Sequence, residues 1–191
     1  MCEYVALGSN CSVTWWLNQY KLRSCAYPFD WSNVSIIQIN KILKNNFKNY
    51  SETLEIQFIS DKFLSVEGDS TAVIKNSYGV KFAHEVLTTD IENFKKSIDN
   101  RITRFYELKS KDFIVYVRIE LKPLNEKYLK ELQELIQLLN NINTNYLLKI
   151  IIHKDTKIKI SFDKVEIHYF ETFSEDWKMS FINWSDVLIG K

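Results

Sequence analysis

Glycine, proline and cysteine are scarce in this sequence, with four, two and three residues respectively among 191. No linker rich in proline or glycine, low-complexity tract or internal repeat interrupts the chain. Because 46% of the residues are hydrophobic and 14% are aromatic, a chain of this length can bury a substantial core. We therefore expect one domain that spans residues 1–191.

The cysteines show no pattern typical of a disulfide framework or a zinc site. Their number is odd, and Cys2, Cys11 and Cys25 form neither a CxxC pair nor a cluster with histidines at zinc-ligand spacing. The first residues also lack the basic region and the apolar stretch of a signal peptide. The sequence thus predicts free thiols, no bound metal and a cytoplasmic protein.

An excess of charge of one sign is absent as well. The 25 Lys and Arg residues nearly balance the 24 Asp and Glu residues, so the chain has no overall electrostatic footprint for nucleic acid or an anionic membrane. No segment approaches the roughly 20 apolar residues of a membrane span. We expect neither nucleic acid nor a membrane as a partner, and the oligomeric state is left open.

The motifs of several large enzyme classes are missing. The sequence contains no P-loop, no GxGxxG dinucleotide fingerprint, no HExxH and no GxSxG. ATP hydrolysis, Rossmann-type dehydrogenation, zinc-dependent proteolysis and serine-hydrolase chemistry therefore lack their signatures. We expect no cofactor.

Hydrophobic periodicity predicts alternating helices and strands in the second half of the chain. The expected order is a helix at 90–109, a strand at 113–117, a helix at 125–141, strands at 147–152, 158–160 and 165–170, and a helical tail at 175–189. A strand, a helix and a strand in succession predict a parallel pair of strands.

The first half combines two helices with short β-rich runs. A strand at 4–7 is followed by a helix at 12–22, a loop at 23–31, a helix at 33–46 and β-rich runs at 54–58, 63–66, 72–74 and 80–82. We predict a single three-layer α/β domain with a mainly parallel central sheet and a β-rich insertion around residues 53–85. Ligand sites in such sheets lie beyond the carboxyl ends of the strands.

A turn at one such end, Gly8-Ser9-Asn10-Cys11, separates the first strand from the first helix. The start of a helix exposes unpaired N–H groups and the positive end of the helix dipole, so a cysteine there ionises more readily than a free thiol. Cys11 is therefore a candidate nucleophile, and the alternative is a small buried cysteine that packs behind the strand. The N–H groups of Gly8, Ser9 and Asn10 are candidates for binding an anionic group.

A nucleophilic thiol needs a base, and the chain offers three histidines. His84 is the best candidate because it ends a predicted strand and is followed by Glu85, whose carboxylate can orient the ring. The alternative is a partly exposed histidine at a strand end. His153 also ends a strand and is the reserve candidate, whereas His168 lies inside an alternating strand and is expected to be structural.

Two further charged residues have a catalytic and a structural interpretation. Asp30 can orient a catalytic imidazole, but we favour a role in which it caps the following helix while its neighbours Phe29 and Trp31 fill the core. Arg104 lies on a predicted helix and either binds an anionic substrate group or pairs with a surface acid.

Four motifs in order resemble an uncharacterised family labelled "putative papain-like cysteine peptidase", found in large DNA viruses and bacteria. The chain carries them as LGSNCS at 7–12, YPFDW at 27–31, YGVKFAHE at 78–85 and RITRFY at 101–106. The resemblance implies Cys11 as nucleophile, His84 as base and Asp30 as a less secure orienting residue. It also implies a papain-like α+β fold as the alternative to the parallel sheet, and the host cytoplasm as the location if the protein is viral. No Gln precedes Cys11 to complete a papain-like oxyanion hole, so Asn10 or helix-start N–H groups are the substitutes.

Three functional classes follow. The first is a cofactor-independent thiol hydrolase that acts on a peptide or another small acyl substrate. The second is a sugar- or nucleotide-processing α/β enzyme that binds an anionic group at the turn 8–11, with Cys11 incidental. The third is a non-catalytic interaction domain that uses its aromatic residues as a binding surface.

Overall fold

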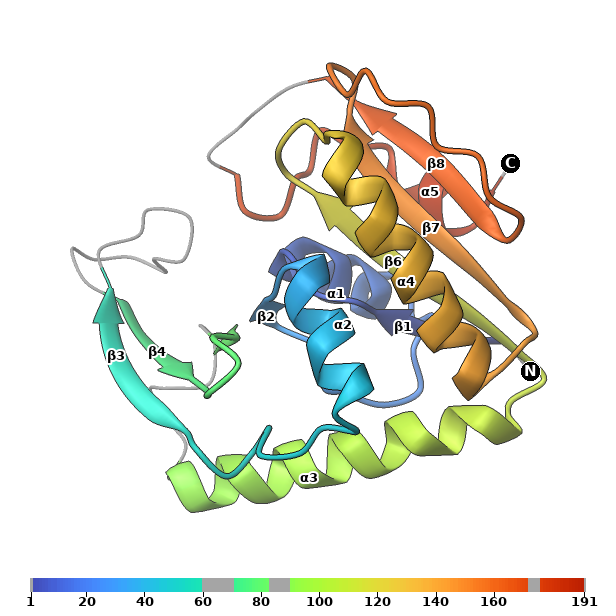
Figure 1. The fold of residues 1–191 in the computed structure, drawn as a ribbon. Coiled ribbons are helices and arrows are strands. Elements are labelled where there is room, and N and C mark those ends of the chain that lie inside the picture. Colours follow the sequence, from blue (N-terminus) through green and yellow to red (C-terminus); the bar gives the residue numbers. More distant parts are fainter. Residues whose placement is uncertain (1, 60–70, 83–89, 172–175, 191) are drawn as a thin grey trace.

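A computed structural model of the protein describes residues 2–59, 71–82, 90–171 and 176–190 (Figure 1). Its centre is a four-stranded sheet in the order β1-β6-β7-β8, and each neighbouring pair of strands is parallel. The strands are β1 (Cys2–Ala6), β6 (Phe113–Glu120), β7 (Tyr146–His153) and β8 (Val165–Phe170). This arrangement confirms the predicted parallel sheet and differs from the antiparallel barrel of papain-like enzymes.

Helices cover both faces of this sheet, which confirms the predicted three layers. One face packs against α2 (Ile36–Lys44), α3 (Ile91–Glu107) and α4 (Glu126–Ile142). The other face packs against α1 (Cys11–Gln19), α5 (Trp184–Leu188) and the turns that precede α5. The short 3-10 helix η1 (Leu108–Ser110) follows α3 directly. In Figure 1, α2 and α4 lie side by side on the first face.

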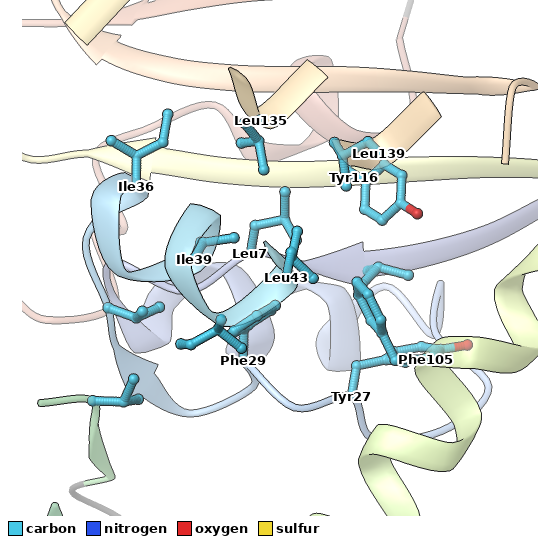
Figure 2. Packing of buried hydrophobic residues seen from close by; sticks show 14 of the residues in the cluster. Leu7, Tyr27, Phe29, Ile36, Ile39, Leu43, Phe105, Tyr116, Leu135 and Leu139 are labelled. Carbon is cyan, nitrogen blue, oxygen red and sulfur yellow. The ribbon is translucent and has the colours of Figure 1, made fainter. Parts of the chain in front are cut away.

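The larger hydrophobic cluster explains why the two halves of the chain fold together. Figure 2 shows side chains of α2 and α4 meeting above residues of the sheet, with Leu7 among them. Phe29 and Phe105 approach edge-on, with ring centroids 5.9 Å apart, and so join the loop 23–31 to α3. Each fully buried aromatic or leucine side chain contributes about 1.5–3 kcal/mol.

A second sheet is antiparallel, with the order β2-β5-β4-β3, and it confirms the predicted β-rich insertion. Its strands are β2 (Ser32–Asn33), β3 (Glu55–Ile59), β4 (Thr71–Lys75) and β5 (Lys81–Phe82). Within the described residues, β5 pairs with β2 through two residue pairs, Ser32 with Phe82 and Asn33 with Lys81. The predicted strand 63–66 lies outside the described residues.

Three sequence-based expectations about elements are wrong. Residues 158–160 form no strand, because the chain there runs through bends toward β8. The tail is not one helix: among its described residues, 176–189, turns and a bend precede α5, which is the one helical stretch. Met179, Ile182 and Trp184 pack into the hydrophobic cluster on this face of the sheet, so tertiary packing rather than helix propensity shapes the segment. Asp30 does not cap α2, because Ser35 is its N-cap and forms a capping box with Gln38.

Candidate functional site

The turn that follows β1 lies at the carboxyl edge of the parallel sheet, as predicted. Leu7 continues the β1 ladder by donating its N–H to the Val117 carbonyl over 2.9 Å. Gly8 and Ser9 then both adopt a positive φ, at 63° and 75°. A Cβ on Gly8 would collide with Val34 and lie 3.2 Å from Ser32 Oγ. Glycine is therefore required both for the backbone conformation and for the close approach of the segment that contains β2.

Asn10 begins α1 by capping it, and this places Cys11 as the first helical residue. Asn10 Oδ1 accepts a hydrogen bond from the Ser12 N–H over 2.7 Å. The sequence motif thus produces the predicted strand, turn and helix start, with the helix beginning one residue earlier than expected. All three cysteines are free, in agreement with the sequence-based expectation, and Cys11 is the buried one.

The expectation that the helix start makes the Cys11 thiol more acidic is wrong. Only 5% of Cys11 is exposed, and burial raises the pKa of its thiol to about 12. The favourable effect of a helix N-terminus on a thiolate is smaller than the cost of removing that thiolate from water. Cys11 is therefore a neutral thiol at physiological pH in this structure.

Asp30 is fully buried and holds the loop 23–31 against α1. Its Oδ2 accepts from Arg23 Nη1 over 2.5 Å and from the Tyr27 N–H over 2.8 Å, and Thr14 Oγ1 donates to Oδ1 over 3.4 Å. Burial raises the pKa of the Asp30 carboxyl, while the Arg23 guanidinium and the Tyr27 N–H act in the opposite direction. Packing is thus shown for Asp30, whereas its predicted role in orienting His84 stays a prediction.

Arg104 also contacts this loop rather than a surface acid. Its guanidinium donates to the Ala26 carbonyl over 3.2 Å, and Arg104 is half-buried on α3. Together with the edge-on contact of Phe29 and Phe105, this bond brings the second and fourth sequence motifs next to each other. The binding of an anionic substrate group by Arg104 stays a prediction.

Arg118 is the residue at this edge that sequence reasoning missed. It is completely buried on β6 and donates to the Leu7 carbonyl over 2.6 Å and to the Val34 carbonyl over 3.2 Å. It also forms a 2.5 Å ion pair with Glu120. Burial lowers the pKa of Arg118, whereas the Glu120 carboxylate raises it. The net shift of this pKa is upward. An arginine within the apolar run 113–119, two residues before a glutamate on the same strand, was the available signal.

The histidines that the structure describes do not bond Cys11. His153 lies at the carboxyl end of β7, where Nδ1 accepts from the Asp155 N–H over 3.2 Å and the ring packs edge-on against Phe170. His168 lies on β8, 2.6 Å from Glu166, and its pKa is lowered mainly by burial. These contacts agree with the structural role expected of His168. The preferred candidate, His84, and its neighbour Glu85 lie outside the described residues.

The pairing of β5 with β2 nevertheless fixes the position of Phe82, the last described residue before His84 in the sequence. Phe82 pairs with Ser32, and Ser32 lies directly against Gly8, three residues before Cys11. Phe82 is two residues before His84 in the sequence. The last described residue before His84 in the sequence is thus paired with Ser32, which lies against the Gly8 turn.

The described ranges contain no group of three or more His, Cys, Asp or Glu residues that could hold a metal ion. None of their helices is long and apolar enough to cross a membrane.

Comparison with known proteins gives a family and a viral relative. The relative is the uncharacterized protein R408 of Acanthamoeba polyphaga mimivirus, which is 28% identical over 98% of this chain and 97% of its own length. No solved structure matches the chain. The model of the family DUF1796, described as "Putative papain-like cysteine peptidase", matches residues 2–156, which include all four motifs that suggested the resemblance. Because that match covers most of the chain, this protein belongs to the DUF1796 family.

Proposed function

We propose that this protein is a cofactor-independent cysteine hydrolase in which Cys11 is the nucleophile and His84 is the general base. The observation that carries the proposal is the contact at which Phe82 pairs with Ser32 and Ser32 lies against Gly8. Cys11 follows Gly8 by three residues in the sequence, and His84 follows Phe82 by two, although Cys11 and His84 are 73 positions apart. The family description supports thiol chemistry at this turn.

The burial of the Cys11 thiol determines when its proton is removed in the first step. Because burial raises the pKa of Cys11 to about 12, a stable thiolate–imidazolium pair is not the resting state that this site favours. The His84 imidazole instead removes the thiol proton as the sulfur–carbon bond to the acyl group forms. The carbonyl oxygen becomes an oxyanion, for which the Asn10 amide and the N–H groups at the start of α1 are the candidate donors.

The second half of the reaction restores the enzyme. The bond from the acyl carbon to the leaving group breaks, and the imidazolium gives its proton to that group, which leaves a thioester on Cys11. A water molecule then attacks the thioester carbon while His84 accepts one water proton. That proton returns to the sulfur as the acid product departs. No cofactor enters this sequence of steps.

The anion-binding alternative has less support at this turn. The two N–H groups that flank the turn are already bonded, since Leu7 donates to the Val117 carbonyl and Ser12 donates to Asn10 Oδ1. The approach of Val34 also fills the space beside Gly8 that a ligand would need. The proposal transfers the thiol chemistry of the family description but not a papain-like fold, because the central sheet is parallel.

The test uses p-nitrophenyl acetate as a small acyl probe on a background in which the other two thiols, Cys2 and Cys25, are replaced by serine. Mass spectrometry should locate an acetyl group on Cys11, and Cys11→Ala should abolish both this adduct and ester turnover. His84→Ala should slow acylation by roughly 100-fold or more, and added imidazole should restore part of the rate.

A matched control is His153→Ala, which removes a histidine from the same edge of the sheet without removing the proposed base. It should leave the acylation rate within about twofold, because residues outside the reacting groups contribute little to the proton transfer. Unchanged ester turnover in Cys11→Ala, or equal effects of His84→Ala and His153→Ala, would refute the proposed dyad.

A further inference from the structure

A cavity of about 430 Å³ lies where the carboxyl-terminal ends of α2, α3 and α4 meet. Because α3 with η1 leads into the start of β6, and α4 leads into the start of β7, this cavity lies at the amino edge of the parallel sheet. The Cys11 turn lies at the carboxyl edge. The cavity lining includes Lys44, Phe47, Phe105, Tyr106, Lys109 and Leu138.

The inner wall of the cavity is apolar and rigidly packed. Phe47 and Phe105 are buried, and their ring centroids are 5.4 Å apart in an edge-on contact. Phe47 is seated by the end of α2, where its N–H bonds to the Ile42 carbonyl over 3.0 Å. Tyr106 forms part of the rim, and its ring is 5.9 Å from that of Phe47. A ring or a branched hydrocarbon group matches this wall.

Several carbonyl groups at the end of α3 and in η1, beside the cavity, already accept hydrogen bonds from groups other than a lysine. At the end of α3, the Leu108 N–H bonds to the Phe105 and Tyr106 carbonyls, and Ser110 Oγ donates to the Glu107 carbonyl. Asn143 Nδ2, which follows α4, donates to the Leu108 carbonyl over 3.0 Å. The positive charge of a nearby lysine is therefore available for another partner.

The two lysines of the rim differ in whether a partner neutralises their charge. Lys44 forms an ion pair with Glu134 on α4. Within the described residues, Lys109 makes no hydrogen bond or ion pair, although it lines the same cavity. One uncompensated ammonium thus lies at the rim of an apolar pocket, together with the side-chain amides of Asn46 and Asn141.

We propose that this cavity binds a small amphiphilic monoanion, with its hydrocarbon group against Phe47 and Phe105 and its carboxylate at Lys109. The volume falls within the range of about 300–1,000 Å³ that is typical of small-molecule sites, which are mostly apolar with a few polar groups that fix the orientation. The site is separate from the Cys11 turn, so the proposal does not depend on the hydrolase proposal.

Calorimetric titration with phenylpropionate and with its uncharged isostere phenylpropionamide tests the proposal on the full chain. The acid should bind the wild type about tenfold more tightly than the amide, because it gains a charge-assisted hydrogen bond. Lys109→Gln should abolish this preference. Lys96→Gln, which removes the same charge elsewhere on α3, should preserve it. Leu138→Trp should weaken both ligands by at least about tenfold, because the indole occupies the cavity.

Circular dichroism verifies that each variant is folded. If a variant fails to fold, the affinities of the wild type for phenylpropionate and phenylpropionamide still test the proposal. Equal affinity of the acid and the amide for the wild type, or a preference that survives in Lys109→Gln, would overturn the proposal. Binding should be unchanged in Cys11→Ala, which separates this site from the Cys11 turn.

Discussion

The buried Arg118 guanidinium donates to the Leu7 carbonyl over 2.6 Å and so joins the middle of β6 to the turn before Cys11. The same group donates to Val34, the residue that closes the space beside Gly8. One side chain thus fixes both segments that shape the candidate site. A buried cation with several acceptors is typical of a group that positions backbone segments rather than one that contacts substrate.

Arg118→Met should lower the free energy of unfolding by about 3–5 kcal/mol, because two carbonyl groups and the Glu120 carboxylate lose their partner. Urea denaturation measures this change. The double variant Arg118→Met with Glu120→Leu should recover much of the loss, since no unpaired charge then remains. A loss below about 1 kcal/mol in the single variant would contradict the role assigned to Arg118.

Gly8→Ala should destabilise the fold by at least about 3 kcal/mol, because alanine meets both an unfavourable positive φ and a collision with Val34. Gly190→Ala is the matched control: its φ is also positive, at 71°, but nothing lies within 4 Å of the added Cβ. The control should lose only about 1–2 kcal/mol. Equal urea midpoints for the two variants would show that Val34 and its neighbours can shift to make room for the added Cβ.

The Cys11 thiol should make stability depend on pH in the alkaline range. Its pKa is about 12 in the folded protein, against 9.0 for an unperturbed thiol. A folded-state pKa above the unfolded value stabilises the protein fully below pH 9, and this stabilisation is lost as the pH rises toward 12. Wild type should therefore lose about 1.4 kcal/mol relative to Cys11→Ala between pH 8 and 10. Chemical denaturation at each pH measures the difference, and a constant difference would show that the sulfur is not desolvated. Cys11→Val should give the same slope as Cys11→Ala.

Asp30→Ala should lower the free energy of unfolding by about 3–5 kcal/mol, because Arg23 and the Tyr27 N–H lose their shared acceptor inside the protein. Asp30→Asn retains an acceptor oxygen and should lose less. Acetylation of Cys11 by p-nitrophenyl acetate, measured on folded Asp30→Asn, separates two roles. A rate within about twofold of wild type indicates that Asp30 only holds the loop, whereas a loss of 100-fold or more would show that it orients the base.

Much of the architecture could be predicted from hydrophobic periodicity. The runs around β6 and β7 are long and apolar on both faces, which is the pattern of buried parallel strands, and α4 between them has a clear apolar stripe. Local patterns failed where tertiary contacts decide the structure. The residues before α5 are held by bonds such as that from Trp16 Nε1 to the Lys178 carbonyl over 2.7 Å, which no local periodicity reveals.

The candidate site was predictable in position but not in its electrostatics. The order of small polar residues after an apolar strand indicated the turn, the Asn10 cap and the helix that begins at Cys11. Burial of the thiol depends on side chains far away in the sequence, so the sign of its pKa shift could not be derived from the helix start alone. Arg118 was missed for a similar reason, since its acceptors lie 111 and 84 residues away.

The short pairing between β2 and β5 has a dynamic consequence for the turn that contains Cys11. The two described residue pairs provide little cooperativity, so we expect this pairing to separate in a local fluctuation whose free energy is below that of global unfolding. Ser32 lies against Gly8, whereas the β6 ladder is paired along both edges. Exchange of amide hydrogens in β2 and β5 should therefore be much faster than in β6. Access of reagents to the buried sulfur should then follow this subglobal equilibrium rather than the stability of the whole domain.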